Sequence, residues 1–135
     1  MTTVQEAREA LAGAVTFGTG LPCSPWLLDA VVESPSCQVG RREMDPRMVL
    51  DRGVSVYQLV VRLFVARHNA IDAQRRIDEF CEPTGTSSIR VAIEDGDAWT
   101  ATVDYAAVTS IGEIVEREIG AASYFTVDFD VEVVW

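Results

Sequence analysis

The chain has 135 residues, a formal net charge of −10 and 48% hydrophobic residues. This length fits one domain, residues 1–135, which buries enough surface to fold without a disulfide or a metal ion. The composition excludes a disordered chain, no apolar run is as long as a membrane span, and the first residues lack the pattern of a signal peptide. We therefore expect a soluble protein without a membrane partner.

The negative charge is concentrated at the C-terminal end. Residues 1–90 contain ten arginines and eleven acids, whereas residues 91–135 contain one base, Arg117, and ten acids. The chain has no lysine. Because nonspecific DNA wrapping needs clustered positive charge, this distribution argues against it.

Residue types that catalyse reactions or bind metals are not clustered in the sequence. The three cysteines lie far apart without a CxxC pair, so we expect small buried side chains rather than a disulfide framework. The single histidine, His68, gives little support to a metal site or a Cys–His dyad. We predict no catalytic residue, no cofactor and no metal. The cysteines are Cys23, Cys37 and Cys81.

The first predicted element is a helix over residues 3–15. Apolar side chains recur there at helical spacing, and Thr3 and Glu6 have the spacing of a capping box. Gly18 and Gly20 are expected to end this helix. Their context, without a strand before and a helix after, does not fit a phosphate loop.

A long proline-broken region precedes the clearest strand of the chain. Residues 21–53 contain four prolines and are expected to be mostly loop, with a short strand at Cys37–Val39. Residues 54–67 alternate at period two and predict a long strand with one apolar face. The other face mixes Gln58 and Arg62 with apolar side chains, so we expect it to be half covered.

Two helices are predicted next. Asn69 is a good N-cap for an amphipathic helix over residues 70–82. Ser87 or Ser88 then begins a second helix of one to two turns. The acids at 94–97 that follow fit a solvated turn better than a calcium loop.

The C-terminal part of the chain predicts strands. We expect a strand around Val103–Val108, and residues 110–120 fit either a helix or a strand hairpin, of which the surrounding β pattern favours the hairpin. Residues 123–135 alternate between an apolar face and an acidic face. The element order predicts an α+β fold in which a mostly antiparallel β-sheet packs against two to three α-helices, as a two-layer sandwich. The acidic face contains Asp128, Asp130 and Glu132.

The order and spacing of these elements resemble the tail terminator proteins of long-tailed bacteriophages, particularly those that infect actinobacteria. The middle block carries most of the resemblance: a strand ending in arginine, a helix with an Ala-Gln pair, a Gly-Thr-Ser-Ser turn and a second small helix. The resemblance covers about residues 4 to 134. The matching segments are SPSCQV, the Met44-Asp45 turn, VYQLVVRLFVAR, AIDAQRRIDEFCEPTGTSSIRVAIEDGD, VDYAAVTSIGEI and SYFTVDFDVEV.

The resemblance implies a structural virion protein without catalytic residues. Such proteins form a ring, commonly of six copies, that caps the head-proximal end of the tail tube, stops its polymerisation and joins the tail to the neck. The implied partners are further copies of the chain, the major tail tube protein and a head-completion or neck protein. DNA passes through the ring without specific binding. The implied location is the virion, with assembly in the host cytoplasm.

Two sets of charged residues are candidates for contacts in such a ring. The arginines of the 40–53 loop are predicted to meet acids of a neighbouring subunit, or else only to solvate the loop. The acidic face of the last strand is predicted to line the DNA channel and repel phosphate, or else to be an ordinary solvated surface. The loop arginines are Arg41, Arg42, Arg47 and Arg52, and the acids are Asp128, Asp130 and Glu132.

Two other functions remain open from the sequence. One is another head-to-tail connector, such as a neck or head-completion protein, which would bind the portal side rather than the tube. The other is a small ligand-binding or enzymatic α+β domain with Tyr57, Tyr105 or Trp99 in a pocket, which would need convergent polar groups there.

Overall fold

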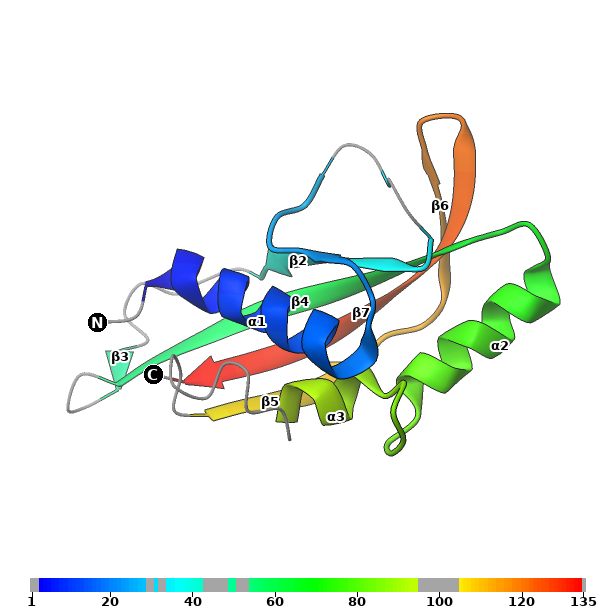
Figure 1. Ribbon diagram of the computed structural model, residues 1–135. Coiled ribbons are helices and arrows are strands. Elements are labelled where there is room, and N and C mark those ends of the chain that lie inside the picture. The colour runs from blue at the N-terminus through cyan, green and yellow to red at the C-terminus, as the bar shows by residue number, and fades with distance from the viewer. Residues whose placement is uncertain are drawn as a thin grey trace.

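The computed structural model describes residues 3–28, 31, 34–42, 49–50, 54–94 and 105–134. These residues form a mixed α+β fold, in which a mostly antiparallel sheet packs against three helices (Figure 1). The predicted fold class is therefore confirmed. Among the described residues, no helix has the length and apolar character needed to cross a membrane.

Helix α1, Val4–Thr19, begins where the sequence predicts and continues one turn further. The Thr3 hydroxyl accepts a hydrogen bond from the Glu6 amide, as a capping box requires. Gly20, in the left-handed conformation at φ 77°, ends the helix, whereas Gly18 lies within its last turn. A Cβ on Gly18 would lie 2.4 Å from the Cβ of Ala92, so this glycine permits the close approach of α1 to α3.

The two other helices confirm the predicted caps. Helix α2, Ala70–Cys81, begins after Asn69, whose side chain accepts hydrogen bonds from two backbone amides of the first turn. Helix α3, Ile89–Glu94, follows Ser88, whose hydroxyl accepts from the Val91 amide at 3.2 Å.

The described part of residues 21–53 contains more strand structure than the sequence predicts. Strand β2, Ser36–Arg41, extends the predicted segment at both ends, and two short strands, β1 (Cys23–Ser24) and β3 (Val49–Leu50), were not expected. Strand β4, Val54–Ala66, is the predicted long strand. It pairs antiparallel with β2 and β3, while β1 joins the outer side of β2 in parallel.

The C-terminal strands settle the ambiguous segment in favour of strands. Strands β5 (Tyr105–Ile111) and β6 (Val115–Ile119) both pair antiparallel with β7, Ala122–Val134. They lie end to end along one side of β7, and β4 lies along the other side. Strands β6 and β7 form a hairpin that extends beyond the rest of the sheet (Figure 1).

The two faces of the sheet differ in composition. One face contributes the alternating apolar residues of β4 and β7 to a core shared with all three helices. We call the opposite face of the sheet the second face. It contains polar side chains of β2, β4 and β7 and a few buried apolar ones. Leu27 packs over this face at Gly40, where a Cβ would lie 2.9 Å from Val60 and 3.1 Å from Leu27. The prediction that this face is half covered is therefore confirmed.

Candidate functional site

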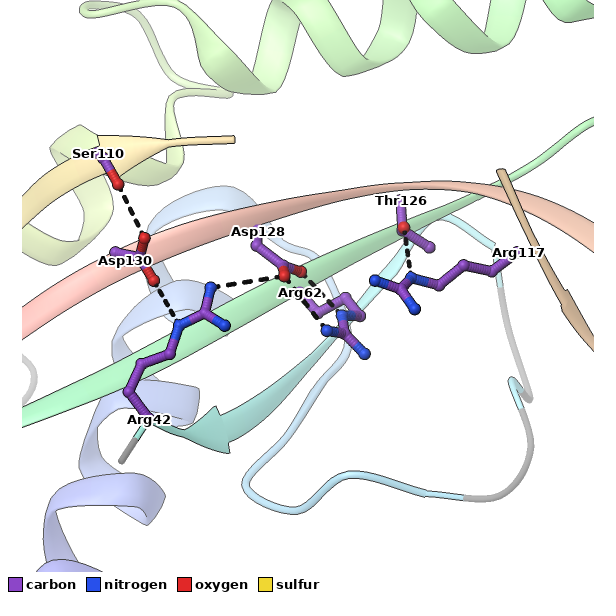
Figure 2. A network of polar contacts seen from close by, with 7 residues as sticks. All are labelled: Arg42, Arg62, Ser110, Arg117, Thr126, Asp128 and Asp130. Atoms are coloured by element: carbon purple, nitrogen blue, oxygen red, sulfur yellow. Dashed lines mark hydrogen bonds and ion pairs between the residues drawn. The ribbon is translucent and has the colours of Figure 1, made fainter. Parts of the chain in front are cut away.

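A network of ion pairs occupies the middle of the second face. The antiparallel register of β4 and β7 places Arg62 directly opposite Asp128. The guanidinium of Arg62 donates two hydrogen bonds to the carboxylate, from Nε to Oδ1 at 2.8 Å and from Nη2 to Oδ2 at 3.2 Å. Figure 2 shows this pair at the centre of the network. Such two-pronged contacts are strong because donors and acceptors are both charged and geometrically matched.

The network continues from this pair toward β2 and β5. Arg42, just past the end of β2, donates from Nε to Oδ1 of Asp130 at 2.8 Å, and its Nη2 lies 3.6 Å from Oδ2 of Asp128. Ser110 of β5 donates its hydroxyl to Oδ2 of Asp130 at 2.8 Å (Figure 2). Asp130 is therefore held from both sides.

The hairpin strand β6 supplies the third arginine of the network. Arg117 donates from Nε to the Thr126 hydroxyl at 3.1 Å, and that hydroxyl donates to the carbonyl of Val115 at 3.1 Å (Figure 2). Thr126 is buried, and these contacts satisfy its hydroxyl. The network thus connects four strands and the residue that follows β2.

The arginines of this network neutralise part of the acidic face of β7. Burial favours a raised pKa for Asp128, but the hydrogen bonds and charge of Arg62, with the charges of Arg42 and Arg117, lower that pKa below its usual value. The Asp128 hydrogen bond raises the pKa of Arg62. Three guanidinium groups here face two carboxylates, Asp128 and Asp130, so the middle of this face is not a negatively charged surface.

A cavity of about 180 Å³ lies at the β6 end of the network. Six of the eight residues that line it are polar or charged, and they include both signs of charge. The two tyrosines named as pocket candidates are not among its lining residues. The cavity is lined by Arg42, Gly112, Glu113, Val115, Arg117, Thr126, Asp128 and Asp130.

The four arginines predicted to contact a neighbouring subunit differ in their positions. Arg42 binds acids of its own chain, and Arg41 is an exposed residue at the end of β2. Arg47 and Arg52 lie outside the described residues, as does Trp99. Contact of these arginines with a neighbouring subunit stays a prediction.

Exposed apolar side chains gather next to β2, which the sequence reading missed. Trp26, Leu27 and Leu28 are between 42% and 51% exposed. Arg8 of α1 holds this segment in place, since its guanidinium lies 4.4 Å from the Trp26 ring and donates to the carbonyls of Pro25 and Val39, both at 2.8 Å. The signal was present as three consecutive large apolar residues after a proline in a loop.

The border of the sheet at β5 and β6, across from β1 and β2, has a second group of exposed apolar side chains. Ile111, Ile114 and Val115, at the junction of β5 and β6, are each more than a third exposed. Glu113, in the same segment, and Glu118, further along β6, are also exposed. Among the described residues, no three His, Cys, Asp or Glu side chains are arranged to hold a metal ion.

Searches against protein-family models and against curated proteins found no match to this chain.

Proposed function

We propose that the chain is a phage tail terminator that assembles head to tail into a ring, commonly of six copies, at the head-proximal end of the tail tube. The proposal starts from the resemblance of its element order to that family. Its further partners are the major tail tube protein and a neck protein. DNA passes through the ring without a specific binding site, and no cofactor or catalytic residue takes part.

The observation that carries this proposal is the difference between the two borders of the sheet. The basic border, next to β1 and β2, combines Arg41 with the exposed apolar segment Trp26–Leu28. The acidic border, at β5 and β6, combines exposed apolar residues with Glu113 and Glu118. A closed ring requires two different and complementary surfaces on each subunit. These borders differ in sign and both expose apolar area, so they fit such a contact.

The edge of β6 supports the same arrangement. Within the described parts of the chain, the backbone of β6 pairs only with β7, and its outer side has no hydrogen-bond partner. An unpaired edge is a common place for contacts between chains. In contrast, β1 and the Arg8 guanidinium cover part of the outer edge of β2.

The test combines a charge reversal with direct observation of the ring. We expect Arg41→Glu to abolish the ring on tail tubes seen by electron microscopy, because it places a negative charge against the acidic border. Adding Glu118→Arg to the same chain should restore the ring in part. Arg75→Glu, on the exposed face of α2, is the matched control and should leave the ring intact.

Arg42 is not used for this test because its substitution would also remove its contacts with Asp128 and Asp130. Normal rings with Arg41→Glu contradict the proposed contact. Binding of the wild-type protein to portal or neck components but not to tail tubes would instead indicate a neck protein.

A further inference from the structure

Two of the three cysteines, distant in sequence, are direct neighbours in the sheet. Cys23 of β1 and Cys37 of β2 are register partners in a parallel pair. The backbone amide of Cys37 donates to the carbonyl of Pro22 at 2.8 Å, which fixes the two strands at this point. Neighbouring strands lie about 4.8 Å apart, within the range of about 4.4–6.8 Å between the Cα atoms of a disulfide. A bond between the two sulfurs therefore needs little backbone movement.

The surroundings of the two thiols differ. Cys37 is 1% exposed and belongs to the core, whereas Cys23 is half-buried and packs against that core. A side-chain hydrogen bond with Cys23, followed by burial, raises the pKa of the Cys37 thiol well above its usual value. The two cysteines are thus neighbours on paired strands, and Cys23 is the one that a reagent in solution reaches first.

We propose that Cys23 and Cys37 form a dithiol site that a small oxidised thiol, of the class of glutathione disulfide, converts into an intramolecular disulfide. The Cys23 thiolate attacks one sulfur of the external disulfide, breaks its S–S bond and releases the first thiol. The Cys37 thiolate then attacks the Cys23 sulfur, breaks the mixed disulfide and releases the second thiol. The external disulfide gains two electrons and the two protons that the cysteines lose.

The bond acts on the segment that forms the basic border. Residues 23 and 37 lie at the two ends of the connection that carries Trp26–Leu28, so the disulfide closes this connection into a loop. Closing a loop of about 15 residues removes conformational freedom from the unfolded chain and raises the thermal midpoint by roughly 9–15 °C.

The timing of this reaction follows from the proposed function. Cytosolic thiols keep such a pair reduced during assembly, and a particle released from the cell meets oxidising conditions. The disulfide would then fix the basic border after the ring has formed. The chemistry itself does not depend on that function, so the experiment tests the chemistry on the isolated full chain.

The experiment treats the folded protein with glutathione disulfide and measures intact mass, followed by peptide mapping. We expect a loss of about 2 Da, one Cys23–Cys37 link, and a higher thermal midpoint that dithiothreitol reverses. Cys81→Ser should behave like the wild type. Cys23→Ser and Cys37→Ser should form no intramolecular bond, and Cys37→Ser should retain one glutathione on Cys23.

Oxidation of the chain in guanidinium provides a second comparison. Without the fold, links between all three cysteines are expected, whereas the folded chain should give only one. A stable glutathione adduct on Cys23 in the folded wild type overturns the proposal, as does a mixture of links that includes Cys81. Either failure leaves the proposed ring untouched, because the charge-reversal test uses reduced protein.

Discussion

The ion pair between Arg62 and Asp128 is expected to contribute about 2 kcal/mol to the free energy of unfolding. Its side chains are 22% and 21% exposed, which places the pair between two known limits. Exposed pairs contribute about 0–1 kcal/mol, and removing one partner of a fully buried pair costs about 3–5 kcal/mol. Two hydrogen bonds between charged groups fit an intermediate value. Asp128→Asn removes the charge while keeping the size of the side chain.

The loss of unfolding free energy is measured by urea unfolding at pH 7, with circular dichroism as the signal. A loss of about 2 kcal/mol corresponds to a thermal midpoint lower by roughly 6–10 °C for a domain of this size. The matched control is Glu132→Gln, which removes an acid from the same face of β7 but opposite Gln58 rather than an arginine. We expect this control to change the free energy by less than about 0.5 kcal/mol.

The pH dependence gives an independent check of the cause. The pKa of Asp128 is lower in the folded chain than the value of about 3.9 expected when unfolded. Its stabilising effect is therefore complete above about pH 5 and is lost as the pH falls through the folded pKa. The difference between wild type and Asp128→Asn should shrink from pH 7 to pH 3. An equal difference at both pH values, or one no larger than that of the control, would refute the assigned role of the ion pair.

Three further predictions concern the helices and the third cysteine. Gly18→Ala should destabilise the chain by about 1–3 kcal/mol in urea unfolding, because its Cβ would overlap Ala92, whereas Gly13→Ala in the same helix meets nothing within 4 Å and should stabilise by about 0.5–1 kcal/mol. Equal effects of the two changes would contradict the close helix contact. Asn69→Ala should cost about 1 kcal/mol by the same measurement, since it removes the N-cap of α2, and Asn69→Asp should retain most of that stability. Burial, with the charges of Asp78 and Glu82, raises the pKa of Cys81 to about 11, so its alkylation by iodoacetamide should be slow at pH 8 and rise steeply above pH 10; rapid reaction at pH 8 would contradict this pKa.

The sequence predicted best the elements whose pattern is local and long. The period-two alternation of β4 and β7 and the capping residues Thr3 and Asn69 each determine their own element, and all four were found as predicted. Strands β1 and β3 are two residues long, too short to show any alternation. Their position depends on neighbouring strands rather than on their own side chains.

The candidate site depended on information that the sequence does not contain. The alternation of β7 correctly placed Asp128 and Asp130 on one face, but not the arginines that neutralise them. Arg62 lies opposite Asp128 only because β4 and β7 pair in one particular register. Arg42 reaches the same acids from a position 88 residues away from Asp130. The position of Cys23 next to Cys37 is likewise a consequence of strand pairing.

The structure divides the acids of residues 91–135 into those that form ion pairs within the chain and those that do not. Four acids of residues 91–135 pair with arginines of residues 1–90, namely Glu94, Glu116, Asp128 and Asp130. Among the described residues, Glu113, Glu118 and Glu132 form no ion pair. The first two lie at the acidic border, and Glu132 lies on the second face.

In the proposed ring, contact between subunits and repulsion of DNA are therefore expected to depend on different residues. Glu118→Gln should weaken ring formation on tail tubes without changing DNA passage in the rings that form. Glu132→Gln should leave ring formation unchanged and slow DNA ejection from assembled particles, because it removes an unpaired negative charge from the second face. Ejection kinetics measured by dye uptake after receptor addition check the second prediction. If Glu132→Gln particles eject DNA at the wild-type rate, the second face does not line the channel, and the unpaired acids act only between subunits.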